Sequence, residues 1–355
     1  MSRTRIPFRN SSLLTLLLYG LPIGLGLIAA VLLPIFTHDG DAVVVYTALD
    51  REFSEPIFDE FTRQTGIRIA AKYDTESTKT IGLTQALLAE QERPRCDLFW
   101  NNEIVNTLRL DQVGLLASYP AMAADAYPTQ FRSPKHAWHG FASRARVLLV
   151  NTDLVAGTNQ PSSIFELVNP AWQNQVGIAK PLAGTTASHA ACLFAVWGEQ
   201  EAKQYFAKIK QNCQVMAGNK QVALAVAQGE LAFGLTDTDD ALIELEKGMP
   251  VKIVYPDQKA DELGTLFIPN TLALIKDSPN PESAQKLVEF LLSPRVERML
   301  AHGPSAQIPL NPAVQASARV ETPQTVRAMV VDFQQAAAQW KAAATFLRDE
   351  FASAD

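Results

Sequence analysis

The sequence predicts an α/β fold with parallel strands, and two observations support this prediction. First, residues 42–113 alternate between strand and helix patterns in the βαβ order that forms a parallel sheet. Second, a similar alternation returns between residues 146 and 275. With 355 residues, 47% of them hydrophobic and 19% charged, the chain is long enough for two domains that each bury a core.

The first alternation begins with the β-branched run AVVVYTA, residues 42–48, which is typical of a buried strand. Asp50 is placed to cap a following helix, in which apolar residues recur every four positions until Gly66 ends it. Residues 67–73 alternate between apolar and polar as a second strand. The remaining patterns are a helix at residues 80–91, a strand at 96–100 and a helix that ends at Gly114.

The second alternation begins with the apolar strand pattern of residues 146–154. Further strand patterns cover residues 176–179, 231–237, 251–255 and 265–275, and helical patterns cover residues 198–212, 219–229 and 239–248. A helix of small residues is also expected from Thr185 onward. After Pro279 the sequence predicts essentially helix alone, including one long helix over residues 322–351.

The first 37 residues have the pattern of a membrane-directed segment. Arg3, Arg5 and Arg9 precede residues 11–36, which carry no charge. This uncharged stretch exceeds both the roughly 20 residues that a helix needs to cross a bilayer and the ~7–15 apolar residues of a secretory signal. We therefore expect residues 1–37 to form an uncleaved inner-membrane anchor, with a removed signal peptide as the alternative. The rest of the chain would then face outward, into the periplasm.

Charge and cysteine spacing argue against two kinds of partner. The net charge is −6 and the basic residues are scattered, so we expect no nucleic-acid partner. Cys96, Cys192 and Cys213 are widely spaced and form no CxxC pair, so they predict no metal site. Two of them lie in apolar contexts, where cysteine usually acts as a small buried side chain rather than in a disulfide.

Polar residues gather where the predicted strands end. In parallel sheets, ligands bind at the carboxyl ends of the strands. The first alternation places these candidate ligand residues along one edge: Asp50, Thr75, Ser77, Thr78, Asn102 and Glu103. In the second alternation, backbone N–H groups at Gly184, Thr185 and Thr186 begin a helix, and a helix N-terminus attracts anions. Trp100, His136, His139 and His189 are expected in structural roles instead.

Asp237, Asp239 and Asp240 form an acidic cluster within four positions. Carboxylates this close repel each other unless a cation or several hydrogen-bond donors lie among them. One aspartate suits a helix N-cap, but three exceed what capping needs. Arg144 and Arg146 would share one face of a strand and are candidate counter-charges. The cleft is therefore expected to suit a ligand that carries both signs of charge.

The order of several motifs resembles the extracellular solute-binding proteins of ABC importers, in particular their ferric-iron-binding branch. The motifs, over roughly residues 42–315, are VVVYTALDREFSEPIFDEFTRQTGI, CDLFWNNE, SRARVLLVNTDL, NPAWQNQVGIAKP, QVALAVAQGELAFGLTD, SPNPESAQKLVEFLLSPRVERML and QIPLNP. The resemblance implies a bilobal periplasmic-binding-protein fold of type II, in which two α/β lobes joined by crossing strands close on a ligand. It implies a first lobe of residues 42–141 plus 266–355 and a second lobe of residues 142–265.

Within this resemblance, the sequence departs from the iron branch at the metal ligands. In that branch two adjacent tyrosines supply phenolate ligands, and Asp239 and Asp240 stand at their positions; Asp50 stands where a histidine is expected. The family's carboxylate ligand falls near Asn102 or Glu103. The residues that correspond to the relatives' anion site are Gly184, Thr185, Thr186 and Asn219. Asp239 and Asp240 remain candidate metal ligands, because carboxylates bind hard cations through oxygen.

The resemblance implies a solute-binding component of an ABC importer, which docks on a membrane permease whose ATPase powers transport. The sequence contains no P-loop GxxxxGK[ST]. The implied ligand is either a metal ion bound with an anion, or a phosphonate or phosphorylated amine. Two alternatives stay open: a membrane-tethered solute sensor, and a hydrolase in which two aspartates act as acid and base. No GxSxG or HExxH motif supports the hydrolase, so we expect no enzyme activity.

Overall fold

Nine strands form one sheet in the computed structural model, which describes residues 42–74, 80–157, 160–315 and 319–352. The strands are β1 (Val43–Thr47), β2 (Ile69–Tyr73), β3 (Leu98–Asn101), β4 (His139–Asn151), β5 (Val176–Ala179), β6 (Cys213–Met216), β7 (Phe233–Asp237), β8 (Val251–Val254) and β9 (Phe267–Leu274). The helices are α2 (Arg51–Thr65), α3 (Ile81–Ala89), α4 (Val105–Gln112), α5 (Gly184–Trp197), α6 (Glu199–Asn212), α7 (Asn219–Ala227), α8 (Thr238–Glu246), α9 (Pro281–Leu291), α10 (Pro294–His302) and α11 (Phe333–Phe351). Short 3₁₀ turns are η3 (Met122–Ala126), η4 (Thr129–Phe131), η5 (Ile164–Val168) and η6 (Pro170–Trp172).

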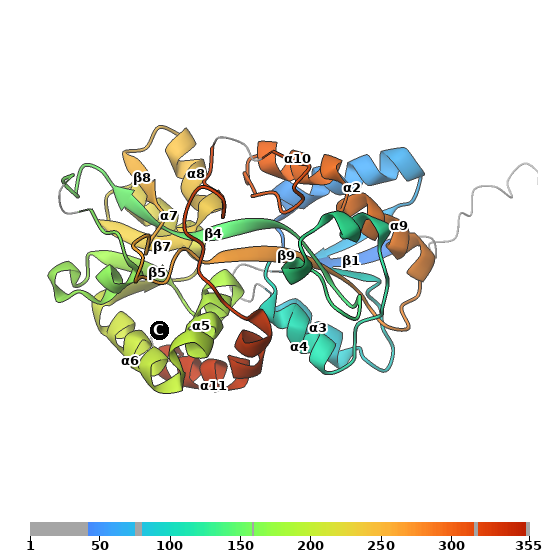
Figure 1. Cartoon of the computed structure of the whole chain (residues 1–355), viewed down its shortest axis with the longest axis horizontal. Helices are drawn as coiled ribbons and strands as arrows, with labels where there is room; N and C mark the ends of the chain where they lie inside the picture. Colours follow the sequence, from blue (N-terminus) through green and yellow to red (C-terminus); the bar gives the residue numbers. More distant parts are fainter. Residues whose placement is uncertain (1–41, 75–79, 158–159, 316–318, 353–355) are drawn as a thin grey trace, which may run out of the picture. The chain divides into compact units, whose positions relative to one another are not determined.

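The sheet has two halves, each built around three parallel strands. Its order is β2-β1-β3-β9-β4-β7-β5-β6, and β8 pairs with β4. The first half contains β2, β1 and β3, and the second half contains β7, β5 and β6. The antiparallel strands β4 and β9 lie between the halves and run from one to the other (Figure 1). This is the two-lobed α/β fold with crossing strands that the family resemblance implied.

Strand β4 changes partners along its length. It pairs with β9 as far as Ala145, and with β7 from Arg146 onward. A β-bulge between Phe141 and Ser143 interrupts the first part, and Ala142 there has a φ of 35°. The Glu297 carboxylate accepts the Ala142 backbone N–H at 2.7 Å, which satisfies a donor that the ladder leaves unpaired.

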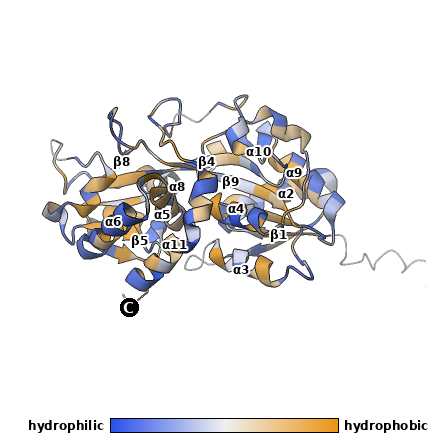
Figure 2. Cartoon of the chain, turned by 60° about the horizontal axis from the view of Figure 1, so that its bottom comes forward, coloured by the Kyte–Doolittle hydropathy of each residue, from blue (hydrophilic) through white to orange (hydrophobic). Residues whose placement is uncertain are grey.

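Apolar side chains turned toward the sheet hold the helices in place, and Figure 2 shows the strands mostly in hydrophobic colours and the outer helix faces in hydrophilic ones. α2 illustrates the local logic: it buries Phe53, Ile57 and Phe61, and it ends at Gly66, whose φ of 75° suits glycine. α11 packs against α5 and α6 of the second half and also against α4 of the first half. It therefore contacts both halves.

Three details of the sequence-based expectation need correction. Residues 322–332 are not helical: Ala328 forms an isolated β-bridge with Thr265. α11 begins only at Phe333, and the side chain of Asp332 caps it. Strand β6 was not predicted, although it directly follows α6 and pairs with β5. Asp50 precedes α2 as expected, but its side chain makes no capping hydrogen bond.

The three cysteines are free and buried, and the burial of Cys96 and Cys192 agrees with the apolar contexts in which the sequence places them. Among the residues that the structure describes, we find no helix with the length and apolar character required to span a membrane. The expected anchor, residues 1–37, lies outside the described residues. The lobe boundaries near residues 141 and 266 stay a prediction.

Candidate ligand-binding site

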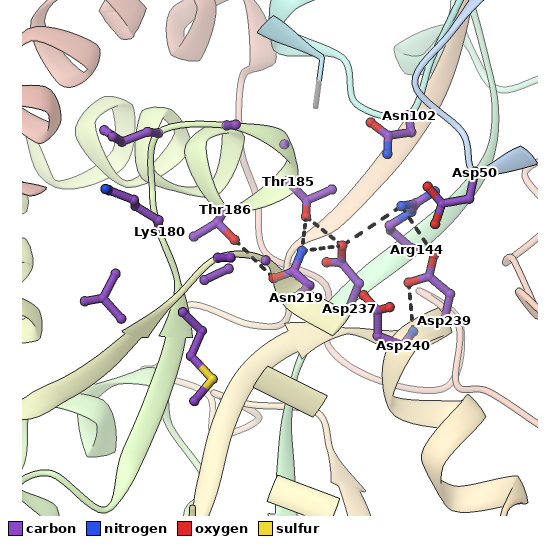
Figure 3. A pocket seen from close by; sticks show the side chains of 18 residues that line it. Asp50, Asn102, Arg144, Lys180, Thr185, Thr186, Asn219, Asp237, Asp239 and Asp240 are labelled. Atoms are coloured by element: carbon purple, nitrogen blue, oxygen red, sulfur yellow. Dashed lines mark hydrogen bonds and ion pairs between the residues drawn. The ribbon is translucent and has the colours of Figure 1, made fainter. Parts of the chain in front are cut away.

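A cavity of about 420 Å³ lies where strands from both halves end (Figure 3). Its walls come from the segments that follow β1, β3, β5, β6 and β7, together with Arg144 of β4. The lining residues predicted from the sequence are Asp50, Asn102, Arg144, Gly184, Thr185, Thr186, Asn219, Asp237, Asp239 and Asp240. The carboxyl ends of the strands therefore form the site, as expected for this class of sheet.

A buried ion pair forms the floor of this site. Arg146 of β4 stands directly opposite Asp237 of β7 in the antiparallel ladder, and its Nη1 donates to Asp237 Oδ1 at 2.7 Å. Arg146 is 0% exposed and Asp237 2%. Burial alone would raise the pKa of the Asp237 carboxyl, but Arg146 and Arg144 hold it below its usual value. The Asp237 carboxylate therefore stays ionised beside these two guanidinium groups.

The same ion pair orients the predicted anion site. Asp237 Oδ2 accepts from the Thr185 hydroxyl at 2.6 Å and from Asn219 Nδ2 at 3.0 Å. Arg146 donates to Thr185 Oγ1, to Thr186 Oγ1 and to Asn219 Oδ1 at 3.0 to 3.2 Å. Asp237 therefore accepts from several protein donors, and these contacts hold Thr185 and Asn219 in place beside it.

The start of α5 presents backbone donors to the cavity. The first bond within this helix runs from the Ala187 N–H to Ala183, and no side chain caps the helix. Gly184 has a φ of 59°, a left-handed conformation that favours glycine. The N–H groups of Gly184, Thr185 and Thr186 therefore precede the first bonded turn, where an anion is attracted.

Arg144 lies two residues before Arg146 on the same face of β4. Its Nη1 is 3.3 Å from Asp239 Oδ2 and 4.0 Å from Asp237 Oδ2. Burial opposes the charge of Arg144, but Asp239, Asp237, Asp50 and Asp240 together raise its pKa above the usual value. The guanidinium is therefore charged and lies inside the acidic cluster.

The acidic cluster itself is compact. One carboxylate oxygen from each of Asp237, Asp239 and Asp240 lies within 4.8 Å of the others. Asp239 Oδ1 also accepts the Asp240 backbone N–H, so the first turn of α8 orients both side chains. Figure 3 shows Asp50 and Asn102 facing this cluster across the cavity.

Among the described residues, one predicted site residue, Glu103, does not line this cavity. Glu103 is buried elsewhere: its carboxylate accepts the backbone N–H groups of Val105 and Asn106 at the start of α4, and the hydroxyl of Ser188. Its role is helix capping and contact with α5 rather than lining the cavity. Thr75, Ser77 and Thr78 lie outside the described residues.

Three of the residues expected in structural roles, Trp100, His139 and His189, are buried. Trp100 packs in the first half against Phe58 and Phe141. His139 contacts the Tyr119 carbonyl, and burial lowers its pKa to about 4. His189 is buried in α5, where burial and then Arg146 lower its pKa to about 3.

Lys180 is a lining residue that sequence reasoning missed. It directly follows β5 and precedes the turn at the start of α5, and Figure 3 places its side chain on the wall of the cavity. Its position after a predicted strand was the available signal, because Asp50 and Asn102 also line the cavity from positions after strands.

Comparisons with known proteins agree with this architecture. The family model described as "Bacterial extracellular solute-binding protein" matches residues 105–338. The major ferric iron-binding protein of Neisseria meningitidis is 26% identical over 302 residues, which cover 79% of this chain and 86% of that protein. A Salmonella typhi protein, named as a proposed 2-aminoethylphosphonate-binding periplasmic protein, is 25% identical over 262 residues. The aligned region covers 72% of this chain and 71% of that protein.

A solved structure supports the same fold. The periplasmic binding protein AfuA from Actinobacillus pleuropneumoniae superposes with a TM-score of 0.78 at 20% identity, covering 88% of this chain and 99% of that chain. The match to the family model agrees with the fold that the sequence motifs implied. The matched residues 105–338 make up well over half of the chain. The chain is therefore a member of the bacterial extracellular solute-binding protein family.

Proposed function

We propose that the protein captures a small charged solute between its two halves and delivers it to the permease of an ABC importer. The cavity is the observation that supports this most directly, because Asp50 and Asn102 from one half face Arg144 and the acidic cluster across it. A ligand that contacts both sides stabilises the closed arrangement of the halves. The permease can then distinguish the loaded protein from the empty one.

The residues of the cavity suit a ligand with both signs of charge. The start of α5, Arg144 and Lys180 attract an anionic group, and Asp239 and Asp240 attract a cationic one. A phosphonate or a phosphorylated amine fits this description, and the Salmonella typhi relative is named for such a ligand. A metal ion bound with an anion is the second candidate, because three carboxylate oxygens lie within 4.8 Å and the Neisseria relative is named for ferric iron.

We further propose how the chain is divided and where it is held. The first lobe comprises residues 42–141 and 266–355 and the second lobe residues 142–265, which is supported by the change of partners along β4 near Ala145. The arginines before the uncharged stretch of residues 11–36 support an anchor in the inner membrane, with the lobes in the periplasm.

Thermal unfolding of the purified protein with candidate ligands tests the ligand class. The probes are 2-aminoethylphosphonate, phosphoethanolamine, and ferric ion with phosphate. A ligand at 100 times its dissociation constant should stabilise the folded protein by about 2.7 kcal/mol. Asp239→Asn and Asp240→Asn should reduce the response to the stabilising probe. No shift with any probe would refute the proposed ligand class, and an unchanged response in both variants would refute the assignment of the acidic cluster.

A further inference from the structure

Two buried side chains that line the cavity carry polar atoms with no hydrogen-bond partner in the described part of the chain. Arg144 is 4% exposed, and its Nε and Nη2 have no acceptor. Asn102 is 2% exposed, and its Oδ1 has no donor. Figure 3 shows these two residues in the same cavity, on segments of opposite halves. Buried polar atoms are rarely left unpaired, so these atoms indicate where ligand groups bind.

The position of Arg144 argues against a metal ion in the acidic cluster. Its Nη1 is 3.3 Å from Asp239 Oδ2 and 4.0 Å from Asp237 Oδ2, so a fixed positive charge already lies among the carboxylates. A metal ion held by these oxygens would lie next to that charge and be repelled by it. Asp237 is also occupied by Arg146, Thr185 and Asn219.

One anionic group can reach both Arg144 and the start of α5. Thr185 Oγ1 and Arg144 Nη1 lie 2.6 Å and 4.0 Å from the same atom, Asp237 Oδ2. The helix N-terminus that contains Thr185 and the guanidinium are therefore neighbours. A phosphonate or phosphate has three oxygens, which can accept from both at once. The Asp237 carboxylate lies between Thr185 and Arg144, and its ion pair with Arg146 offsets its charge, so it does not repel the anion.

We propose that the ligand is a short zwitterion that binds without metal. Its phosphonate or phosphate accepts from Arg144 and from the start of α5, and its ammonium group donates to Asp239, Asp240 and Asn102 Oδ1. Arg144 thereby determines specificity, because it binds the anion and excludes metal ions from the acidic cluster. This inference rests on the proposed solute capture and narrows its ligand to one of the two classes.

Isothermal titration calorimetry of the full chain tests this inference with three probes. The first is 2-aminoethylphosphonate, the second is ethylphosphonate, which lacks the ammonium group, and the third is ferric ion with phosphate. We expect ethylphosphonate to bind at least 10-fold more weakly than 2-aminoethylphosphonate. The ferric probe should bind the wild-type protein no more tightly than it binds the Asp240→Asn variant. Arg144→Gln should weaken 2-aminoethylphosphonate binding at least 10-fold, because it removes charged hydrogen bonds.

Two further variants keep the test interpretable. Arg144→Lys preserves the charge beside Asp239 but not the Nε and Nη2 donors, so it should fold and still weaken binding of 2-aminoethylphosphonate. Arg132→Gln removes an arginine that pairs with Asp125 away from the cavity and should leave the affinity unchanged. Circular dichroism confirms that each variant is folded.

The outcomes separate this inference from the proposed function. Tight binding of the ferric probe by the wild-type protein, lost in Asp240→Asn, would overturn the inference and leave solute capture intact. Equal affinity for ethylphosphonate and 2-aminoethylphosphonate would overturn the zwitterion, and unchanged affinity in both Arg144 variants would overturn the role of Arg144. If none of the three probes binds, both this inference and the proposed ligand classes fail.

Discussion

Replacing Arg146 with methionine should strongly destabilise the folded protein. Arg146 is fully buried, and its guanidinium donates to Asp237 and to Thr185, Thr186 and Asn219. Methionine fills much of the volume but leaves the Asp237 carboxylate buried without its 2.7 Å partner, and Arg144 Nη1 lies 4.0 Å from it. Breaking a buried ion pair by removing one partner costs about 3–5 kcal/mol. We therefore expect the free energy of unfolding to fall by about 4 kcal/mol at neutral pH.

Urea denaturation followed by circular dichroism measures this loss. Arg132→Met is the matched control, because Arg132 pairs with the exposed Asp125 and such a surface pair contributes only about 0–1 kcal/mol. If the free energy of unfolding falls no more in Arg146→Met than in Arg132→Met, the buried ion pair does not stabilise the site as expected.

The pH dependence of the same difference gives a second check. Burial raises the pKa of Asp237, but Arg146 and Arg144 outweigh it and hold the pKa below the usual 3.8. The stabilisation from this pair is therefore present above pH ~4 and is lost as the pH falls through the lower folded-state pKa. The difference between wild type and Arg146→Met should shrink in acid. A difference that grows below pH 4 would contradict the assigned ion pair.

Three further predictions follow from the described residues. The pKa of His189 is lowered from 6.5 to about 3, first by burial and then by Arg146, so between these pH values the unfolded chain binds a proton at His189 that the folded chain does not. As the pH falls from 6.5 to 3, the free energy of unfolding should therefore fall by about 1.4 kcal/mol per pH unit. Urea denaturation of His189→Gln at several pH values should show a smaller slope. Gly184→Ala should cost about 1–2 kcal/mol of unfolding free energy in urea, because a φ of 59° is unfavourable for alanine. At both Gly184 and the control position Gly157 an added Cβ meets no atom within 4 Å, but only Gly184 has a φ in the left-handed region, so Gly157→Ala should cost less; equal costs would argue against the left-handed turn. Asn102→Leu removes one buried acceptor, which is worth about 1–3 kcal/mol, so it should weaken binding of 2-aminoethylphosphonate by roughly 5- to 150-fold in calorimetry. An affinity within twofold of wild type would show that Asn102 Oδ1 does not face the ligand.

Local patterns in the sequence were sufficient for most of the fold. The alternation around β1, α2 and β2 reflects side-chain periods of 2 and 3.6 residues, and Gly66 ends α2 as its position predicted. The same patterns located the strand ends, which is why most of the candidate residues line one cavity. The bilobal arrangement was predicted from the order of the family's motifs, because periodicity alone cannot tell which strands cross.

The sequence by itself determined which residue types stand at the strand ends, but only the tertiary structure decided their separate roles. Arg144 and Arg146 look equivalent along β4, yet Arg146 pairs with Asp237 in the ladder and Arg144 lines the cavity. Glu103 looked like a ligand but caps α4. The reason is physical: strand register joins Arg146 to a residue 91 positions away, and such a pairing leaves no trace in local sequence periodicity.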